Sequence, residues 1–393
     1  MSELEVLRIR APEGLLIPKL YLYSFLNLVE ARKSEIGQYI ELRGKDVLGA
    51  ILDAIKTVKE IIERRRREET LRRLSELPMN NNDKKIFMKL CAELKCELDP
   101  IAILKAYSDV LSSPRVGGLD RLRRGLENFS VSDGHALPSI FKLELYALTR
   151  STLFKDGFSI DPKVSSDFLV LMLAGYLISR VGRTMLDRRD WVSVHVLPSE
   201  LMWSRGWWRL ILHERLSGLW CGIRPVDALI LHLLTNLWDL LANEPHDLLI
   251  LGVIDPMGRR PAASAVSIHA PLREMYIRSG RLLEYISAEE ESKNALNWLV
   301  RKALTIDQLG REVAEKFVKL IFLAIQGDRM ALEELSLMSS RLETRILSIK
   351  QIKQPKGLER ELLAIARDAR RIAGRLLEYR FKPSQEPQNE TCR

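Results

Sequence analysis

The segment on which this fold depends begins Asp190-Trp191-Val192-Ser193-Val194-His195-Val196. Its valines alternate with larger or polar side chains, and a period of two residues is typical of a β-strand with one buried face. Two further short apolar runs, Leu248–Leu251 and Ser264–Ile268, lie on either side of the turn-forming residues Asp255–Pro261. The segment 190–269 therefore predicts a small β-sheet, and the residues between its first two strands predict helices.

Most of the remaining sequence predicts helices. The clearest is Asp46–Leu77, where apolar residues recur every three or four positions and so share one helical face. A buried helix is predicted over Pro162–Arg188, whose apolar run is shorter than the roughly twenty residues a bilayer needs. Near the N-terminus, Leu4–Arg10 and Tyr39–Leu42 predict edge strands that can join the later sheet. Beyond Pro271 we predict helices over Leu272–Ile286, Glu289–Gln326, Asp328–Lys350 and Gly357–Phe381.

Together these elements predict an α+β fold that is predominantly α-helical, with a small central β-sheet covered by helices and a C-terminal helical bundle. Pro78–Asp83, with three successive Asn, predicts a linker. We expect an N-terminal α/β segment with a long helix over 1–77, a helical insert over 84–160, a central α/β body with Trp-rich helices over 161–270, the bundle over 271–382 and a disordered tail over 383–393.

The composition permits a polyanionic partner without requiring one. The chain has 61 Lys and Arg against 52 Asp and Glu, for a net charge of +9, and an ordinary basic soluble protein has a similar balance. Charged, Arg- and Glu-rich helices indicate a heat-adapted protein. Four Cys without a secretory signal indicate a reducing cytoplasm. Cys91 and Cys96 would lie about 140° apart on a helix, so neither a metal site nor a cofactor is expected.

Several arginine groups are candidates for nucleic-acid contact. The glycine-containing loop 112–118 carries Arg115 and is followed by Arg121 and Arg124, so it can approach a phosphate backbone. It has no Lys-Ser/Thr pair of the kind that a P-loop requires, and a plain connecting loop is the alternative. The run Arg64–Arg67 predicts either a solvated charged face or a phosphate-contacting face.

Aromatic residues and a β-turn offer two more candidates. Trp207 beside Arg205 can stack on an unpaired base, although core packing explains the same tryptophan equally well. Arg259 and Arg260 occupy the tip of the predicted turn between two strands, where paired arginines can enter a groove of a duplex. A solvated hairpin is the alternative.

The last helix and the residues that precede it carry a large local excess of positive charge. At 100° per residue Lys356, Arg360, Arg367, Arg371 and Arg375 fall on one face, opposite an apolar stripe. From Arg341 to Lys382 there are twelve Lys and Arg against five Asp and Glu. Such a face can meet several successive phosphates, or it can be an ordinary solvated surface.

One pattern suggests an enzyme instead. Arg189 is followed by His195 six positions later, and this spacing is similar to that of HEPN ribonucleases, in which Arg and His act on the scissile phosphate. In those enzymes the motif begins a helix, whereas the alternating valines here favour a strand. An ordinary sheet histidine is the other interpretation of His195.

The layout, with Ile17-Pro18-Lys19-Leu20-Tyr21-Leu22-Tyr23 near the start and long helices after Pro271, resembles the large subunits of archaeal type I CRISPR interference complexes, most closely type I-A. The resemblance implies a non-catalytic, cytoplasmic subunit of an antiviral ribonucleoprotein that meets guide RNA, target DNA and other subunits, among them a helicase-nuclease. Relatives read a short motif beside the target and hold the displaced strand. Arg259 and Arg260 are then our candidates for the motif, and the face from Arg360 to Arg375 for the backbone. A protein-only helical scaffold and a HEPN-like ribonuclease are the competing hypotheses.

Overall fold

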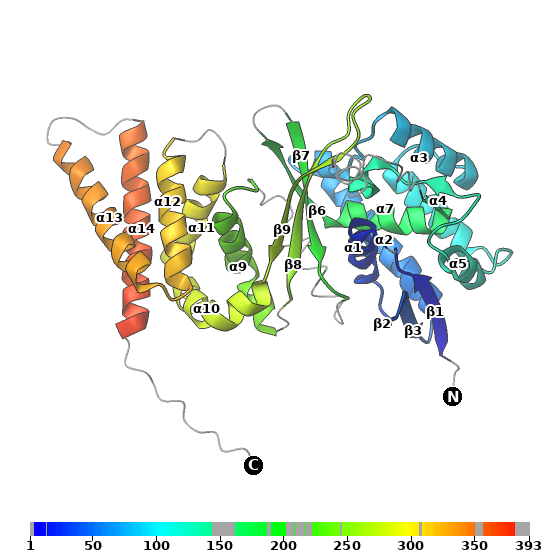
Figure 1. Cartoon of the computed structure of the whole chain (residues 1–393), viewed down its shortest axis with the longest axis horizontal. Coiled ribbons are helices and arrows are strands. Elements are labelled where there is room, and N and C mark those ends of the chain that lie inside the picture. Colours follow the sequence, from blue (N-terminus) through cyan, green and yellow to red (C-terminus); the bar gives the residue numbers. More distant parts are fainter. Residues whose placement is uncertain are drawn as a thin grey trace, which may run out of the picture. The chain divides into compact units, whose positions relative to one another are not determined.

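The computed structural model describes residues 4–12, 14–143, 162–186, 190–201, 208, 216, 222–243, 246–305, 309–349 and 357–381. The chain forms two compact units (Figure 1). The first unit comprises Met1–Cys221 and His246–Pro271, and the second comprises Gly222–Pro245 and Leu272–Arg393. Each unit is therefore built from two separate stretches of the sequence.

The predicted central sheet is confirmed in the first unit. Its strands are β6 (Arg180–Leu186), β7 (Asp190–Pro198), β8 (Leu248–Ile254) and β9 (Ala263–Ala270), which pair antiparallel in that order (Figure 1). Val194 of β7 lies opposite Gly182 of β6 and Gly252 of β8. The alternating valines are buried as predicted, but Ser193 and His195 between them are buried as well, so β7 has two buried faces and not one.

The prediction of one helix from Pro162 to Arg188 is wrong. Helix α7 covers Ser166–Ser179, and the chain passes directly into strand β6 at Arg180. Val181 and Thr184 are β-branched and Gly182 is a poor helix former, so this stretch gains more from ladder hydrogen bonds to β7 than from a longer helix. All fourteen residues of α7 are buried, which makes it the central helix of the first unit.

The N-terminal strands form a sheet of their own, so the expectation that they join the later sheet is wrong. β1 (Glu5–Arg10), β3 (Tyr39–Gly44) and β2 (Arg32–Ile36) pair antiparallel in the order β1-β3-β2. Leu7, Ile9, Ile40 and Leu42 point to one buried face. Helix α1 (Leu16–Leu26) is largely buried and packs against α7.

The predicted helix Asp46–Leu77 is shorter than expected. Helix α2 covers Val47–Arg67, with the Asp46 side chain accepting a hydrogen bond from the Gly49 backbone N–H at 2.7 Å as its N-cap. Glu68 has an extended backbone (φ −91°, ψ 115°) and ends the helix. A 3-10 turn, η1 (Arg72–Ser75), follows and contacts α2 and β6.

Short helices complete the first unit. Helix α3 (Asn81–Leu94) begins within the predicted linker, because the Asn80 side chain caps the Asn82 and Asp83 backbone N–H groups at 2.8 Å. Helices α4 (Pro100–Ser112) and α5 (Gly118–Leu126) follow. The remaining short elements are β4 (His135–Ala136), η2 (Ser139–Phe141) and β5 (Lys163–Val164).

The described elements of the second unit are all helices. It consists of α9 (Val226–Asn243), α10 (Leu272–Ser287), α11 (Glu290–Leu304), α12 (Arg311–Ile325), α13 (Arg329–Ile349) and α14 (Leu358–Phe381). The predicted single helix over 289–326 is wrong, since Gly310 adopts φ +76° and begins a new helix there. The predicted fold class, an α+β chain that is mostly helical with a C-terminal bundle, is confirmed.

Candidate functional site

The arginines of the last helix are bound to carboxylates of the same unit. Arg367 and Arg370 meet Glu343 at 3.2 and 2.9 Å, and their hydrogen bonds lower the pKa of this carboxyl group. Arg371 meets Glu291 at 3.0 Å. The neighbouring helices thus balance much of this positive charge.

Two more members of that predicted face differ in their surroundings. Arg375 lies 4.0 Å from the centre of the Tyr285 ring and 3.2 Å from Glu289. Arg360 is exposed and has no ion pair with any other described residue. The structure therefore leaves Arg360 available at one end of α14 and places Arg375 in the packing of the bundle.

The hairpin between β8 and β9 has one available arginine at its tip. Arg260 donates to Asp190 Oδ1 at 2.7 Å. Arg259 is exposed, and within the described part of the chain it has no ion pair. The Gly258 carbonyl accepts from the Asn81 backbone N–H at 2.9 Å, which ties the tip to the start of α3. Arg259 therefore projects from an anchored turn.

The burial of His195 argues against the ribonuclease hypothesis. His195 is fully buried in β7, and its Nδ1 lies 3.1 Å from the Ser179 hydroxyl. Burial lowers the pKa of His195 well below its ordinary value, so the ring is neutral at physiological pH. A substrate phosphate cannot reach it in this conformation. Arg189, and the predicted stacking residues Arg205 and Trp207, lie outside the described residues.

The three arginines predicted in and after the loop before α5 have different surroundings. Arg121 is half-buried and bound to Asp167 at 3.1 Å and Glu93 at 3.6 Å, so it has a structural role. Arg115 is exposed in the loop. Arg124 is exposed on α5, where it lines a pocket of about 700 Å³ together with residues of the N-terminal sheet.

That sheet has an arginine-rich open face. Strand alternation points Arg8 and Arg10 of β1 away from the core, and the cross-strand register places Arg43 of β3 beside Val6, with Arg32 of β2 on its other side. Arg123 of α5 reaches the same region and donates to the Val6 carbonyl at 3.5 Å. We call Arg8, Arg10, Arg32, Arg43, Arg123 and Arg124 the arginine face.

One buried carboxylate organises this face. Glu41 accepts from Arg8 Nε at 2.9 Å and from Arg43 Nε, and these hydrogen bonds lower its pKa. The side chain of Glu41 is 1% exposed, whereas those of Arg8 and Arg43 are 68% and 50% exposed. The buried carboxylate therefore holds two guanidinium groups in place, and their remaining N–H groups stay exposed to a ligand.

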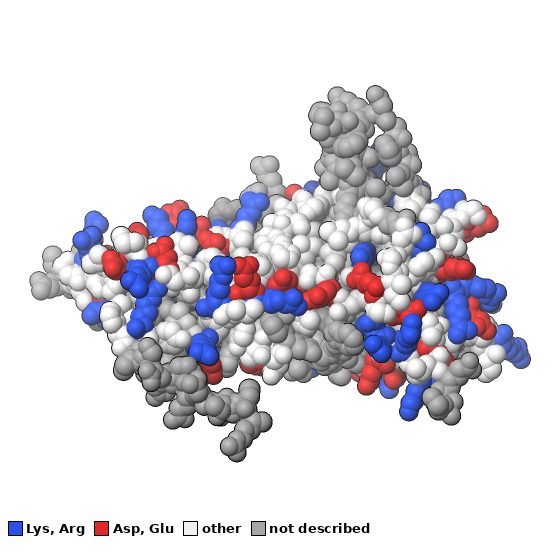
Figure 2. All heavy atoms as spheres, turned by 60° about the horizontal axis from the view of Figure 1, so that its bottom comes forward, with Lys and Arg blue, Asp and Glu red and all other residues white. Residues whose placement is uncertain are grey.

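The pocket on this face is positively charged. Its described lining includes four arginines (Arg8, Arg43, Arg123, Arg124) against two glutamates (Glu41, Glu127), a balance of +2. Figure 2 shows many blue atoms at the right-hand end, the part of the first unit that in Figure 1 contains the N-terminal strands and helices α3, α4 and α5. We did not expect this site from the sequence, although the alternation Leu7-Arg8-Ile9-Arg10 places two arginines on one face of a strand.

A second polar cluster superficially resembles a nucleophile relay. Ser166 Oγ and Glu93 Oε2 lie 3.2 and 3.0 Å from the same ring nitrogen of His135, Nε2, while its Nδ1 is buried without a partner. A relay needs the hydroxyl and the carboxylate on opposite nitrogens, so this geometry does not activate the serine. The described residues hold no cluster of His, Cys, Asp or Glu suited to a metal ion.

No helix in the described ranges is long and apolar enough to cross a bilayer. Comparison with protein families gives a match over most of the chain. The family model of the CRISPR-associated protein CsaX matches residues 41–342, which include most helices of both units. No curated protein and no solved structure matches this chain. Because the match covers more than half of the sequence, the chain belongs to the CsaX family of CRISPR-associated proteins.

Proposed function

We propose that this chain is a non-catalytic nucleic-acid-binding subunit of a CRISPR ribonucleoprotein surveillance complex of type I-A. The observation that carries the proposal is the arginine face, on which four exposed arginines, Arg8, Arg43, Arg123 and Arg124, line a pocket. Family membership supports a role within a CRISPR complex. In this role the arginine face binds the sugar-phosphate backbone of guide RNA or target DNA, and other surfaces bind partner subunits, including a helicase-nuclease.

The arrangement suits the phosphate groups and bases of a nucleic acid. Guanidinium groups bind phosphate oxygens through paired hydrogen bonds, and backbone contacts of this kind position a nucleic acid without reading its sequence. The aromatic ring of Tyr39, which lies 5.1 Å from the Arg10 guanidinium, adds a stacking surface beside the arginines. Together these groups fit a ligand that carries both phosphates and flat bases.

Arg259 is our candidate for reading the motif beside the target. It is exposed at the tip of an anchored turn, whereas its neighbour Arg260 is bound to Asp190. A single arginine can distinguish guanine in the major groove by about 1–3 kcal/mol. If Arg259 has this role, Arg259→Ala reduces the preference among target duplexes with different flanking bases and leaves binding to single strands unchanged.

Charge reversal of the arginine face tests the central proposal. The variant Arg32→Glu with Arg124→Glu removes two exposed arginines and leaves the Glu41 cluster intact. We expect its affinity for labelled single-stranded RNA and for duplex DNA, measured by fluorescence anisotropy at about 0.1 M salt, to fall at least tenfold, because each reversal removes a phosphate contact and adds repulsion.

The matched control is Lys316→Glu with Arg345→Glu, which makes the same change of charge at exposed positions of the second unit. Its affinity is expected to stay within twofold of the original. Equal losses in both variants would mean that net charge and not the arginine face governs binding. Binding that does not depend on salt would favour the scaffold hypothesis, and RNA cleavage by the purified chain would favour a nuclease.

A further inference from the structure

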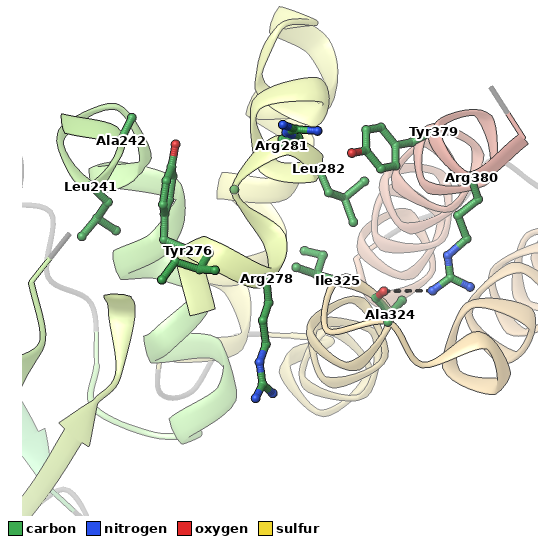
Figure 3. Close-up of a pocket in the computed structure, with 13 residues that line it drawn as sticks. Leu241, Ala242, Tyr276, Arg278, Arg281, Leu282, Ala324, Ile325, Tyr379 and Arg380 are labelled. Carbon is green, nitrogen blue, oxygen red and sulfur yellow. Dashed lines mark hydrogen bonds between the residues drawn. The ribbon is translucent and has the colours of Figure 1, made fainter. Parts of the chain in front are cut away.

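The second unit contains a hollow with an apolar end and a cationic end. Its volume is about 510 Å³, and its described lining comes from α9, α10, α14 and the end of α12. In Figure 3, Leu241, Ala242 and Tyr276 lie at one end, while Arg281, Tyr379 and Arg380 lie toward the other. The described lining contains three arginines and no acidic residue.

A helix-interior glycine shapes the apolar end. A Cβ atom at Gly280 would lie 2.8 Å from two ring atoms of Tyr276, one helical turn earlier on α10. Glycine costs a helix interior about 0.5–1 kcal/mol relative to alanine. Its presence here therefore lets the Tyr276 ring lie across the helix backbone, where the ring forms a wall of the hollow.

The three arginines that line the hollow are available to a ligand. Arg281 is exposed and has no ion pair within the described residues. Arg278 pairs with Glu274, but both side chains are about 60% exposed (63% and 60%), and such surface pairs are weak. Arg380 Nη2 donates to the Ala324 carbonyl at 3.4 Å, which leaves its other donors free to bind an anion.

We propose that this hollow binds one nucleotide, with its base against Tyr276 and its phosphate held by Arg281. A tyrosine ring beside guanidinium groups is the combination that holds a base and a phosphate together. The volume lies within the range of small-ligand pockets. The nucleotide is either a free nucleoside monophosphate or one unit of a single strand. The site lies in the second unit and does not rest on the arginine face.

Isothermal titration calorimetry of the full chain with adenosine monophosphate, adenosine and inorganic phosphate tests the proposal. The monophosphate is expected to bind at least tenfold more tightly than either fragment, because it alone fills both ends of the hollow. Arg281→Ala is expected to weaken it about tenfold through loss of a charge-assisted contact. The control Arg345→Ala, at an exposed position on α13, leaves binding unchanged.

A second variant distinguishes binding inside the hollow from nonspecific attraction of the ligand to positive charge. Gly280→Ala keeps all charges and favours the helix, but it displaces the Tyr276 ring. We expect weaker binding of the monophosphate with no loss of thermal stability. Saturation-transfer NMR should then show reduced contact at the base protons. Unchanged binding in both Arg281→Ala and Gly280→Ala would overturn the proposal.

A third experiment tells whether the ligand is a free nucleotide or one unit of a strand. It uses the Arg32→Glu, Arg124→Glu variant, which lacks two arginines of the arginine face. Binding of a short single-stranded oligonucleotide that depends on Arg281, without binding of the free monophosphate, identifies a unit of a strand. Binding of the monophosphate itself identifies a free nucleotide. If a polyglutamate peptide alone binds in an Arg281-dependent manner, the hollow is a protein-docking site and the proposal is wrong.

Discussion

Neighbouring arginines in one run have different roles in this chain. Arg65 is fully buried and donates to the Leu177 and Ile178 carbonyls at 2.7 and 3.5 Å, at the C-terminus of α7. These carbonyls lack intrahelical donors and form the negative end of the helix dipole. Neither a solvated face nor a phosphate-contacting face, the two alternatives predicted for the run, describes Arg65.

Replacing Arg65 therefore tests whether it supports the core of the first unit. Arg65→Ala leaves buried carbonyls without donors, so we expect a loss of about 3 kcal/mol in the free energy of unfolding. Arg67→Ala, two positions later at an exposed site, is expected to cost less than about 0.5 kcal/mol. Urea unfolding followed by circular dichroism measures both, and equal losses would contradict this role.

The sequence held a signal for Arg65 that we did not use. Val58, Ile61 and Ile62 are buried on the apolar stripe of α2, and Arg65 continues that stripe by one turn. A charge on an apolar stripe indicates a buried partner. In contrast, the pairing of Arg121 with Asp167 brings together residues 46 positions apart, and spacing alone does not predict such a contact.

A buried histidine makes the second unit sensitive to acid. His232 is 1% exposed, and burial lowers its pKa to about 4 from 6.5. The unfolded chain therefore binds a proton between pH 6.5 and pH 4 while the folded chain does not. Stability is fully present above pH 6.5 and falls with pH down to about 4, by about 3 kcal/mol in all.

Thermal unfolding between pH 7 and pH 4.5 checks this expectation. His232→Gln removes the titrating group, so its melting temperature should fall less steeply with acid than that of the original chain. His269→Gln at an exposed position of β9 serves as the control and should retain the original steepness. An unchanged slope in His232→Gln would show that other groups govern the acid sensitivity.

At the scale of elements, close helix packing in the first unit depends on a glycine. A Cβ atom at Gly175 of α7 would lie 1.8 Å from the Tyr21 carbonyl oxygen of α1. This contact lets the two helices approach backbone to backbone. Gly374 of α14 also lies inside a helix, but an added Cβ there meets nothing within 4 Å.

The two glycines are expected to respond in opposite directions to the same substitution. Gly175→Ala forces α1 and α7 apart and should lower the free energy of unfolding by about 2 kcal/mol or more. Gly374→Ala should raise it by about 0.5–1 kcal/mol, since alanine is the better helix former. Thermal or urea unfolding measures both, and a similar effect of the two substitutions would contradict the packing argument.

Strands with a strong local pattern of apolar residues were predictable from the sequence. Strands that depend on pairing with distant segments were not. The alternating valines of β7 and the apolar runs of β8 and β9 identify strands from local sequence alone. Strand β6 was missed because it directly follows a fully buried helix, and its strand form depends on pairing with β7. The separate N-terminal sheet depends on long-range pairing in the same way, so its arginine face could not be assembled from the sequence.

At the scale of the whole molecule, positive charge alone does not identify a binding surface. The final helix carries the longest basic face predicted from the sequence, yet Glu289, Glu291 and Glu343 of its own unit balance Arg367, Arg371 and Arg375. On the arginine face, Glu41 lies beneath the arginines and leaves them exposed. The two surfaces differ in how many arginines have an acidic partner. Three glutamates meet the arginines of α14, whereas Arg32 and Arg124 of the arginine face have no ion pair with a described residue.

This difference predicts the salt dependence of binding. The logarithm of the affinity should fall linearly with the logarithm of the salt concentration, with a slope of about −0.9 for each phosphate neutralised on a duplex. Arg32→Glu with Arg124→Glu should make that slope shallower by about two. Arg367→Glu with Arg371→Glu, on α14, should leave it unchanged, and a change there would restore the last helix as the interface.

The second unit includes one helix that lies between two strands of the first unit in the sequence, and this order affects folding during synthesis on the ribosome. Helix α9 emerges between β7 and β8, but its packing partners α10, α11 and α12 emerge later. The apolar face of α9, from Leu229 to Leu241, is therefore synthesised before these three partner helices and before the last two strands of the sheet. Truncation after Pro271 would remove these three partners of α9. A fragment designed to contain the first unit alone should therefore also omit residues 226–243 and join the flanking strands with a short linker.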